Sequence, residues 1–170
     1  EVWSSRLLIS LLAENNSQDP LKREIHELNA YKIINVSHGD MGPIVDWSKS
    51  KLGFEKENNN TTGIFVIGGF LATDLDRNPT TLGRNGSDFS ASIIASLSNA
   101  ESVTIWTDVD GVMTGDPNQV SGAKIISQMS YDEAAELAYF GAKVIHPKMM
   151  SPLIKKNIPI FIRNTFNSNS

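Results

Sequence analysis

In the first half of the chain, apolar residues recur at helical spacing only near the start. Residues 3–14 carry leucines three and four positions apart, and this stripe predicts a helix. The polar run 15–20 ends in proline and breaks the pattern. Beyond it we expect a charged helix at 21–28, a short strand at 32–36, and loops with one short helix at 46–57.

Continuous apolar runs in the second half predict strands that are buried on both faces. The runs span residues 62–70, 102–107 and 158–163. Within them, the strands should include 64–67, 103–106 and 159–162.

Helical patterns separate these strands. One helix is expected at 87–97, and the capping box Ser130-Tyr-Asp-Glu133 begins another, which Gly141 would end. Pro147 fits the first turn of a further helix. Strands that alternate with helices predict an α/β fold, a three-layer α/β/α sandwich with a mostly parallel sheet.

Composition and charge narrow the classes of function. With 170 residues, of which 40% are apolar, the chain is the size of one domain with a core. A net charge of −4 gives no sign of a nucleic-acid or membrane-surface partner. The sequence has no cysteine, so it forms no disulfide or thiolate metal site, which fits a cytoplasmic protein. No apolar run approaches the ~20 residues that span a bilayer.

A glycine loop that opens a helix is the first candidate site. Gly83 and Gly86 allow the backbone to approach a ligand closely, and Arg84 offers a planar fork for a carboxylate or phosphate. Ser87 can cap the helix, with Asp88 in its first turn. The exposed N–H groups suit an anion, whereas Asp88 favours a metal, a lysine or a substrate ammonium. The alternative interpretation is an ordinary, well-capped junction between loop and helix.

Strand ends supply further candidates, since ligands sit beyond the carboxyl ends of strands in parallel sheets. Gly68-Gly69 ends one strand and Thr107-Asp108 another. With Asp110, Thr107-Asp108 could hold ribose hydroxyls or Mg²⁺, or could simply form an Asp-Gly turn. Lys143 could reach a phosphate as a point charge, or interact with the last helix carbonyls or solvent.

Three ordered stretches resemble the catalytic domain of the aspartokinases, in the amino-acid kinase fold. They are Thr81-Leu-Gly-Arg-Asn-Gly-Ser-Asp-Phe-Ser-Ala, Ile105-Trp-Thr-Asp-Val-Asp-Gly-Val and Tyr139-Phe-Gly-Ala-Lys-Val-Ile-His-Pro. Asn85, Trp3-Ser-Ser and Asp110 are similar to the bifunctional aspartokinase–homoserine dehydrogenase branch. The likeness runs from residue 1 to 166 and implies that residues 1–170 are the C-terminal, nucleotide-binding portion of such a domain.

The resemblance also implies a reaction and a set of site residues. Aspartokinases transfer the γ-phosphoryl group of MgATP to the side-chain carboxylate of L-aspartate, giving 4-phospho-L-aspartate, the first step of lysine, threonine and methionine biosynthesis. By this likeness, the substrate-binding residues are Glu1 for the amino group, Arg84 for the α-carboxylate, and Ser87. The nucleotide-binding residues are Gly68, Gly69, Thr107, Asp108, Met113 and Lys143, and the catalytic ones are Asp88 and Lys143. ATP and Mg²⁺ are the expected cofactors, with no metal ligand assigned in the chain.

Departures from the family pattern shape a further expectation. The family's Lys-Phe-Gly-Gly element precedes the residues present here, Asn118 stands where an arginine is usual, and Met113 replaces a frequent tyrosine. We expect residues 1–170 to include no regulatory domain, and the parent protein is expected to form homo-oligomers. We therefore expect this chain alone to be inactive or nearly so. The alternatives are a non-catalytic nucleotide-binding or dimerisation module, or another amino-acid kinase, acting for example on glutamate or carbamate.

Overall fold

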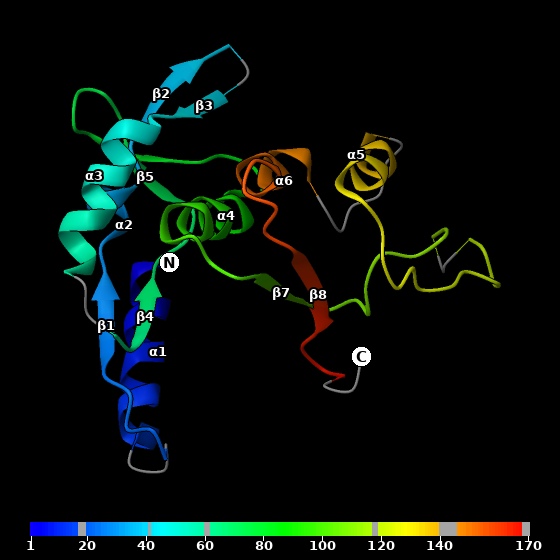
Figure 1. Cartoon of the computed structure of the whole chain (residues 1–170), viewed down its shortest axis with the longest axis horizontal. Coiled ribbons are helices and arrows are strands. Elements are labelled where there is room, and N and C mark those ends of the chain that lie inside the picture. The colour runs from blue at the N-terminus through cyan, green and yellow to red at the C-terminus, as the bar shows by residue number, and fades with distance from the viewer. Residues whose placement is uncertain (17–19, 41, 60–61, 117–118, 140–145, 168–170) are drawn as a thin grey trace. The chain divides into compact units, whose positions relative to one another are not determined.

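The chain is organised as two compact units, Glu1–Ser90 and Ala91–Ser170, and the boundary falls within helix α4 (Figure 1). The computed structural model describes residues 1–16, 20–40, 42–59, 62–116, 119–139 and 146–167.

The first unit pairs strands both in parallel and in hairpins. Its elements are α1 (Val2–Asn15), β1 (Ile25–Leu28), α2 (Ala30–Ile33), β2 (Val36–Gly39), β3 (Gly42–Val45), α3 (Trp47–Asn58), β4 (Ile64–Ile67), β5 (Leu71–Thr73), β6 (Pro79–Thr81) and the start of α4 (Gly86–Ser98). Strands β1 and β4 are parallel, whereas β2 with β3 and β5 with β6 are antiparallel hairpins. Fully buried apolar side chains in this unit include Ile33, Ile34, Val36, Ala72 and Leu82.

The second unit contains one parallel strand pair with helices packed beside it. Its elements are the rest of α4, β7 (Val103–Thr107), α5 (Tyr131–Tyr139), α6 (Pro147–Ile154) and β8 (Ile160–Asn164). The parallel register of β7 and β8 runs from Val103 opposite Ile160 to Thr107 opposite Asn164. One buried cluster joins Ala95, Val103, Leu153 and Ile158, and another joins Ala134, Met149 and Met150.

The helix starts follow local capping chemistry. Ser130 and Glu133 form the predicted capping box: the Ser130 amide donates to Glu133 Oε2 at 2.7 Å, and the Glu133 amide donates to Ser130 Oγ at 3.2 Å. Asp46 caps α3 by accepting from the Lys49 amide at 2.9 Å. Pro147 occupies the first turn of α6, as predicted from its fixed φ. The predicted strands at 64–67, 103–106 and 159–162 and the helices at 3–14, 46–57 and 87–97 are confirmed within one or two residues. The predicted burial of the strands on both faces is wrong for β7 and β8, since Trp106 and Phe161 are exposed.

Two predicted elements are wrong. The expected helix at 21–28 is instead strand β1 over Ile25–Leu28, because these residues pair with β4, a long-range contact that overrides local propensity. The expected strand at 32–36 is only partly extended. Lys32 and Ile33 belong to the short helix α2, whose Tyr31 amide donates to Asn29 Oδ1 at 3.0 Å, whereas Val36 begins strand β2. The hairpin of β2 and β3 also replaces part of the expected loop region.

Candidate functional site

A small hollow in the first unit is lined by all three predicted substrate-binding residues. Its volume is about 360 Å³, and it is lined by Glu1, Phe70 and the loop residues Gly83, Arg84, Asn85, Gly86, Ser87 and Asp88. A carboxylate, a guanidinium and a second carboxyl group therefore border the same space. Such a set can bind a zwitterion that carries both an ammonium and a carboxylate.

Backbone conformation shapes this loop. Gly83 has φ +75° and Asn85 has φ +56°, so the chain turns through left-handed geometry on both sides of Arg84. A Cβ added at Gly86 would lie 2.6 Å from Phe70 Cδ2 and 3.1 Å from Leu82 Cβ. Only glycine fits there, and the close packing fixes where α4 begins.

Ser90 ties the end of β4 to the start of α4. Its hydroxyl accepts from the Phe70 amide at 3.2 Å and donates to the Ser87 carbonyl at 2.7 Å. Gly69 permits this approach, since an added Cβ would lie 3.2 Å from Ser87 Cα and 3.1 Å from Ser90 Oγ. Gly69, which was predicted as a nucleotide contact, thus lies against the start of α4.

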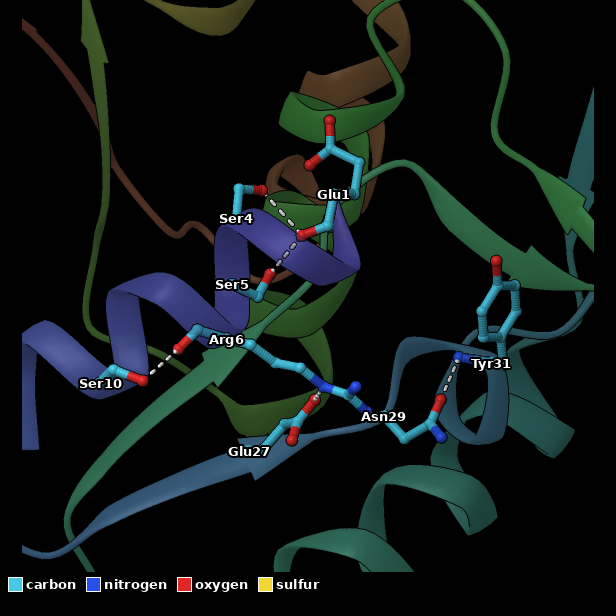
Figure 2. A network of polar contacts seen from close by, with 8 residues as sticks. All are labelled: Glu1, Ser4, Ser5, Arg6, Ser10, Glu27, Asn29 and Tyr31. Atoms are coloured by element: carbon cyan, nitrogen blue, oxygen red, sulfur yellow. Dashed lines mark hydrogen bonds and ion pairs between the residues drawn. The ribbon is translucent and has the colours of Figure 1, made fainter.

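Glu1 is presented by the first turn of α1. Figure 2 shows the hydroxyls of Ser4 and Ser5 donating to the Glu1 carbonyl, at 2.7 and 2.9 Å, while the Glu1 carboxylate points away from them. A Cβ added at Gly68 would lie 3.4 Å from Ser5 Oγ, so Gly68 brings the end of β4 close to this turn. Glu1 is thus the N-cap residue of α1, with its carbonyl held by the first turn, and it lines the hollow.

Asp88 is a partly buried carboxylic acid in the hollow. It lies in the first turn of α4, and burial raises the pKa of its carboxyl group. Ser87 lies inside α4 and does not cap it, which corrects the sequence prediction. The Asn85 carbonyl accepts the amide of Phe89 at 3.1 Å, so the helical hydrogen bonds already begin there. Asp88 is in the first turn, as predicted.

The second unit holds the residues predicted for the nucleotide. Thr107 ends β7, and its hydroxyl donates to Asp108 Oδ1 at 3.2 Å. Met113 is partly buried and forms an isolated bridge with Ile125. A hollow of about 750 Å³ in this unit is lined by Asp110, Gly111, Val112 and residues of β8, among others.

The sequence analysis did not assign two residues that contact the loop after β7, which carries Asp108 and Asp110. Asn164, at the end of β8, donates its Nδ2 to Asp110 Oδ1 at 2.8 Å, and Asn167 donates to the same oxygen at 3.3 Å. Their signal in the sequence is only that polar residues directly follow the apolar strand at 158–163.

Some predictions stay untested. Lys143, Gly141 and Asn118 lie outside the described residues. The loop at 83–88 and Thr107-Asp108 belong to different units, so their predicted convergence on one cleft remains a prediction. Within the described ranges, no cluster of three or more His, Asp or Glu side chains could hold a metal ion. None of the helices in that part of the chain has the length and apolar character of a membrane span.

Comparison with known proteins identifies the family. Residues 5–164 match the family described as the amino acid kinase family. This chain belongs to that family. Among curated relatives of this amino acid kinase chain, bifunctional aspartokinase/homoserine dehydrogenase 1 of Zea mays is 51% identical over 172 residues, covering 100% of the chain and 18% of that protein. The corresponding bifunctional protein of Buchnera aphidicola is 38% identical over 100% of the chain and 20% of its own length.

Solved structures agree with the family assignment and confirm the α/β fold class. Escherichia coli aspartokinase III in complex with aspartate and ADP matches with a TM-score of 0.85 and 30% identity, over 99% of this chain and 37% of that one. Clostridium acetobutylicum aspartate kinase matches with a TM-score of 0.73 and 34% identity, over 82% of this chain and 31% of that one. This amino acid kinase chain thus spans about a fifth of the bifunctional relatives and 37% of the Escherichia coli enzyme.

Proposed function

We propose that the chain is the aspartate- and nucleotide-binding part of an aspartate kinase. The reaction is transfer of the γ-phosphoryl group of MgATP to the side-chain carboxylate of L-aspartate, giving 4-phospho-L-aspartate and ADP. The hollow that carries Glu1, Arg84 and Asp88 supports this proposal most strongly. The likeness to an aspartokinase described in complex with aspartate and ADP adds to it.

The hollow is complementary to an amino acid. In the proposed complex, Arg84 binds the α-carboxylate through its planar guanidinium, and the Glu1 carboxylate binds the α-ammonium group. Ser87 and Asp88 then border the side-chain carboxylate that accepts the phosphoryl group. Since Asp88 is half-buried and acidic, it is suited to orienting the reacting end by hydrogen bonding.

The nucleotide is assigned to the other predicted residues. Thr107, Asp108 and Met113 would hold the nucleoside part, Lys143 the phosphates, and Gly68-Gly69 would leave room beside the substrate. A carboxylate oxygen of aspartate attacks the γ-phosphorus, the bond from that phosphorus to the bridging oxygen breaks, and ADP leaves. Positioning and charge neutralisation dominate such transfers, and a bound Mg²⁺ would supply part of the neutralising charge.

The proposal extends to the setting of the reaction. We assign it to the biosynthesis of lysine and threonine, in a homo-oligomeric parent, with a cytoplasmic location. Several plant relatives are named as chloroplastic, so fractionation of source cells is the check on location.

Two alternatives make different predictions. A non-catalytic module would bind nucleotide, or only a second copy of itself, without recognising aspartate. Another amino acid kinase would bind a different acceptor. A UMP kinase of Bacillus anthracis shares the fold at 15% identity, which by itself carries no functional argument.

Calorimetric titration of the 170-residue chain separates these possibilities. We expect L-aspartate to bind, and L-glutamate and UMP to bind much more weakly. Arg84→Ala should weaken aspartate binding by roughly 10–100-fold, since a hydrogen bond to a charged group contributes about 1.5–3 kcal/mol. Arg23→Ala, an exposed arginine before β1, is the matched control. A folded chain that binds glutamate as well as aspartate, or binds neither, would overturn the proposal.

A further inference from the structure

We propose that Asn164 is a positioning residue for the nucleotide, which acts by holding Asp110 and the loop that follows Thr107-Asp108. The inference rests on the proposed function for that loop and adds residues that the family likeness does not assign. We call this set the Asn164 latch; it consists of Asn164, Asn167 and Asp110.

The sheet brings the latch together. Because β7 and β8 run in parallel, their carboxyl ends lie at the same edge, where Thr107 is opposite Asn164. The pairing continues one residue further, since the Thr165 amide donates to the Thr107 carbonyl at 2.8 Å. Ligands of α/β sheets sit beyond this edge. Asn164 therefore occupies the place on β8 that corresponds to Thr107 on β7.

Both the nitrogen and the oxygen of the Asn164 side-chain amide form hydrogen bonds. Its Nδ2 donates to Asp110 Oδ1 at 2.8 Å, while its Oδ1 accepts from the Phe166 amide at 2.8 Å. Asn167, whose amide donates to the Asn164 carbonyl at 3.3 Å, adds a second contact to Asp110 Oδ1. One side chain thus links the turn after β8 to the loop after β7.

The link matters because the loop after β7 is exposed to solvent. Asp108, Val109 and Asp110 are exposed, and Gly111 follows with φ +142°, a conformation that side chains rarely adopt. Ordering a free loop on binding would cost backbone entropy, and a loop held in advance avoids part of that cost. Asp110 and Gly111 also line the 750 Å³ hollow, whose volume is in the range of small-molecule sites.

MgADP is the probe, titrated into the full 170-residue chain. Asn164→Ala and Asp110→Ala should each raise the Kd for MgADP by roughly 3–10-fold, the effect of losing one partly exposed hydrogen bond to a charged group. Because both variants remove the hydrogen bond between Asn164 and Asp110, their effects on the Kd for MgADP should be less than additive in the double variant. The Kd for aspartate should stay unchanged in all of them. Asn15→Ala, on α1, is the matched control and should leave both Kd values unaltered.

The decisive variant exchanges the hydrogen-bond donor at position 164 with the acceptor at position 110. In N164D/D110N the amide introduced at position 110 can donate to the carboxylate introduced at position 164, which still accepts from the Phe166 amide. MgADP affinity should return to within about twofold of the unsubstituted chain. Unchanged affinity in both N164A and D110A, with circular dichroism showing intact folds, would overturn the inference alone. Failure of the unsubstituted chain to bind MgADP would overturn both the inference and the assignment of the loop to nucleotide.

Discussion

Gly86 shows how a single missing side chain shapes the hollow that we propose binds aspartate. Phe70 and Leu82 close around it so tightly that an added Cβ would approach them to 2.6 and 3.1 Å. Gly86→Ala should therefore destabilise the fold by about 1–3 kcal/mol, the usual cost of overpacking. It should also weaken aspartate binding, because the loop that carries Arg84 must shift. Denaturant titration and calorimetry measure the two effects.

The control for this change is Gly122→Ala. Nothing lies within 4 Å of a Cβ built at Gly122, so the substitution should leave stability and binding near those of the unsubstituted chain. If Gly86→Ala and Gly122→Ala had equal free energies of unfolding and equal affinities for aspartate, close packing around Gly86 would not explain the effect.

Asp88 makes stability depend on pH. Burial raises the pKa of its carboxyl group, so the folded state holds the proton more tightly than the unfolded state. Ionised Asp88 then costs stability at neutral pH, and this cost disappears as the pH falls through the folded and then the unfolded pKa. Asp88→Asn should be more stable relative to the unsubstituted chain at pH 7 than at pH 4.

Denaturant titration at the two pH values checks this expectation. Asp132→Asn is the matched control, since Asp132 is an exposed carboxylate in the first turn of α5. The same pH-dependent gain in both variants would point to the helix end and not to burial of Asp88.

At the scale of elements, local chemistry decided which predictions succeeded. The helix α5 was predictable because its capping box lies within four consecutive residues. Strand β1 was not, since only pairing with β4 makes Ile25–Leu28 extended. The leucine stripe of α1 predicted the helix, yet Leu7 and Leu11 are exposed, so helical periodicity alone did not identify a buried face.

In the candidate site, too, residues close together in sequence were predictable and residues brought in by long-range contacts were not. The loop at 83–88 was predictable because two glycines, an arginine and an aspartate lie close together in sequence. Phe70 was not assigned, because it is distant in sequence from the loop. Its amide donates to the Ser90 hydroxyl of α4, and it lines the hollow with the loop. Asn164 was missed for a similar reason, since its partner Asp110 follows a different strand.

The capping box should make a measurable contribution to stability. Hydrogen bonds from Ser130 lower the pKa of Glu133, so the box contributes above the unfolded pKa of that carboxyl group and is lost as the pH falls through the folded value. Ser130→Ala should lower the melting temperature by about 2–4 °C at neutral pH. Ser121→Ala, in an exposed loop, should not. An unchanged melting temperature in both would show that α5 does not need its cap.

At the scale of the whole molecule, the core of the second unit concentrates on α6. Leu153 is fully buried against Ala95, Val103 and Ile158, whereas its neighbour Ile154 is 43% exposed. Leu153→Ala should reduce the free energy of unfolding by about 2–5 kcal/mol, through lost burial and the cavity left behind. Ile154→Ala, in the same helix, should cost much less. Chemical denaturation followed by circular dichroism compares the two, and similar losses would contradict the assigned core.

The pairing of β7 with β8 also dictates an order of events in refolding. Hairpin β5–β6 closes over the short turn between Thr73 and Pro79, whereas β7 must wait for the distant β8, with Val103 opposite Ile160. Closing a long chain segment is entropically costly and slow. In pulse-labelled hydrogen exchange, the Asp74 amide should gain protection before the Val103 amide, which donates to the Pro159 carbonyl. The edge that carries Asp110 and Asn164 is then among the last parts of the chain to assemble, so a newly made chain must complete this late step before the proposed nucleotide-binding edge exists.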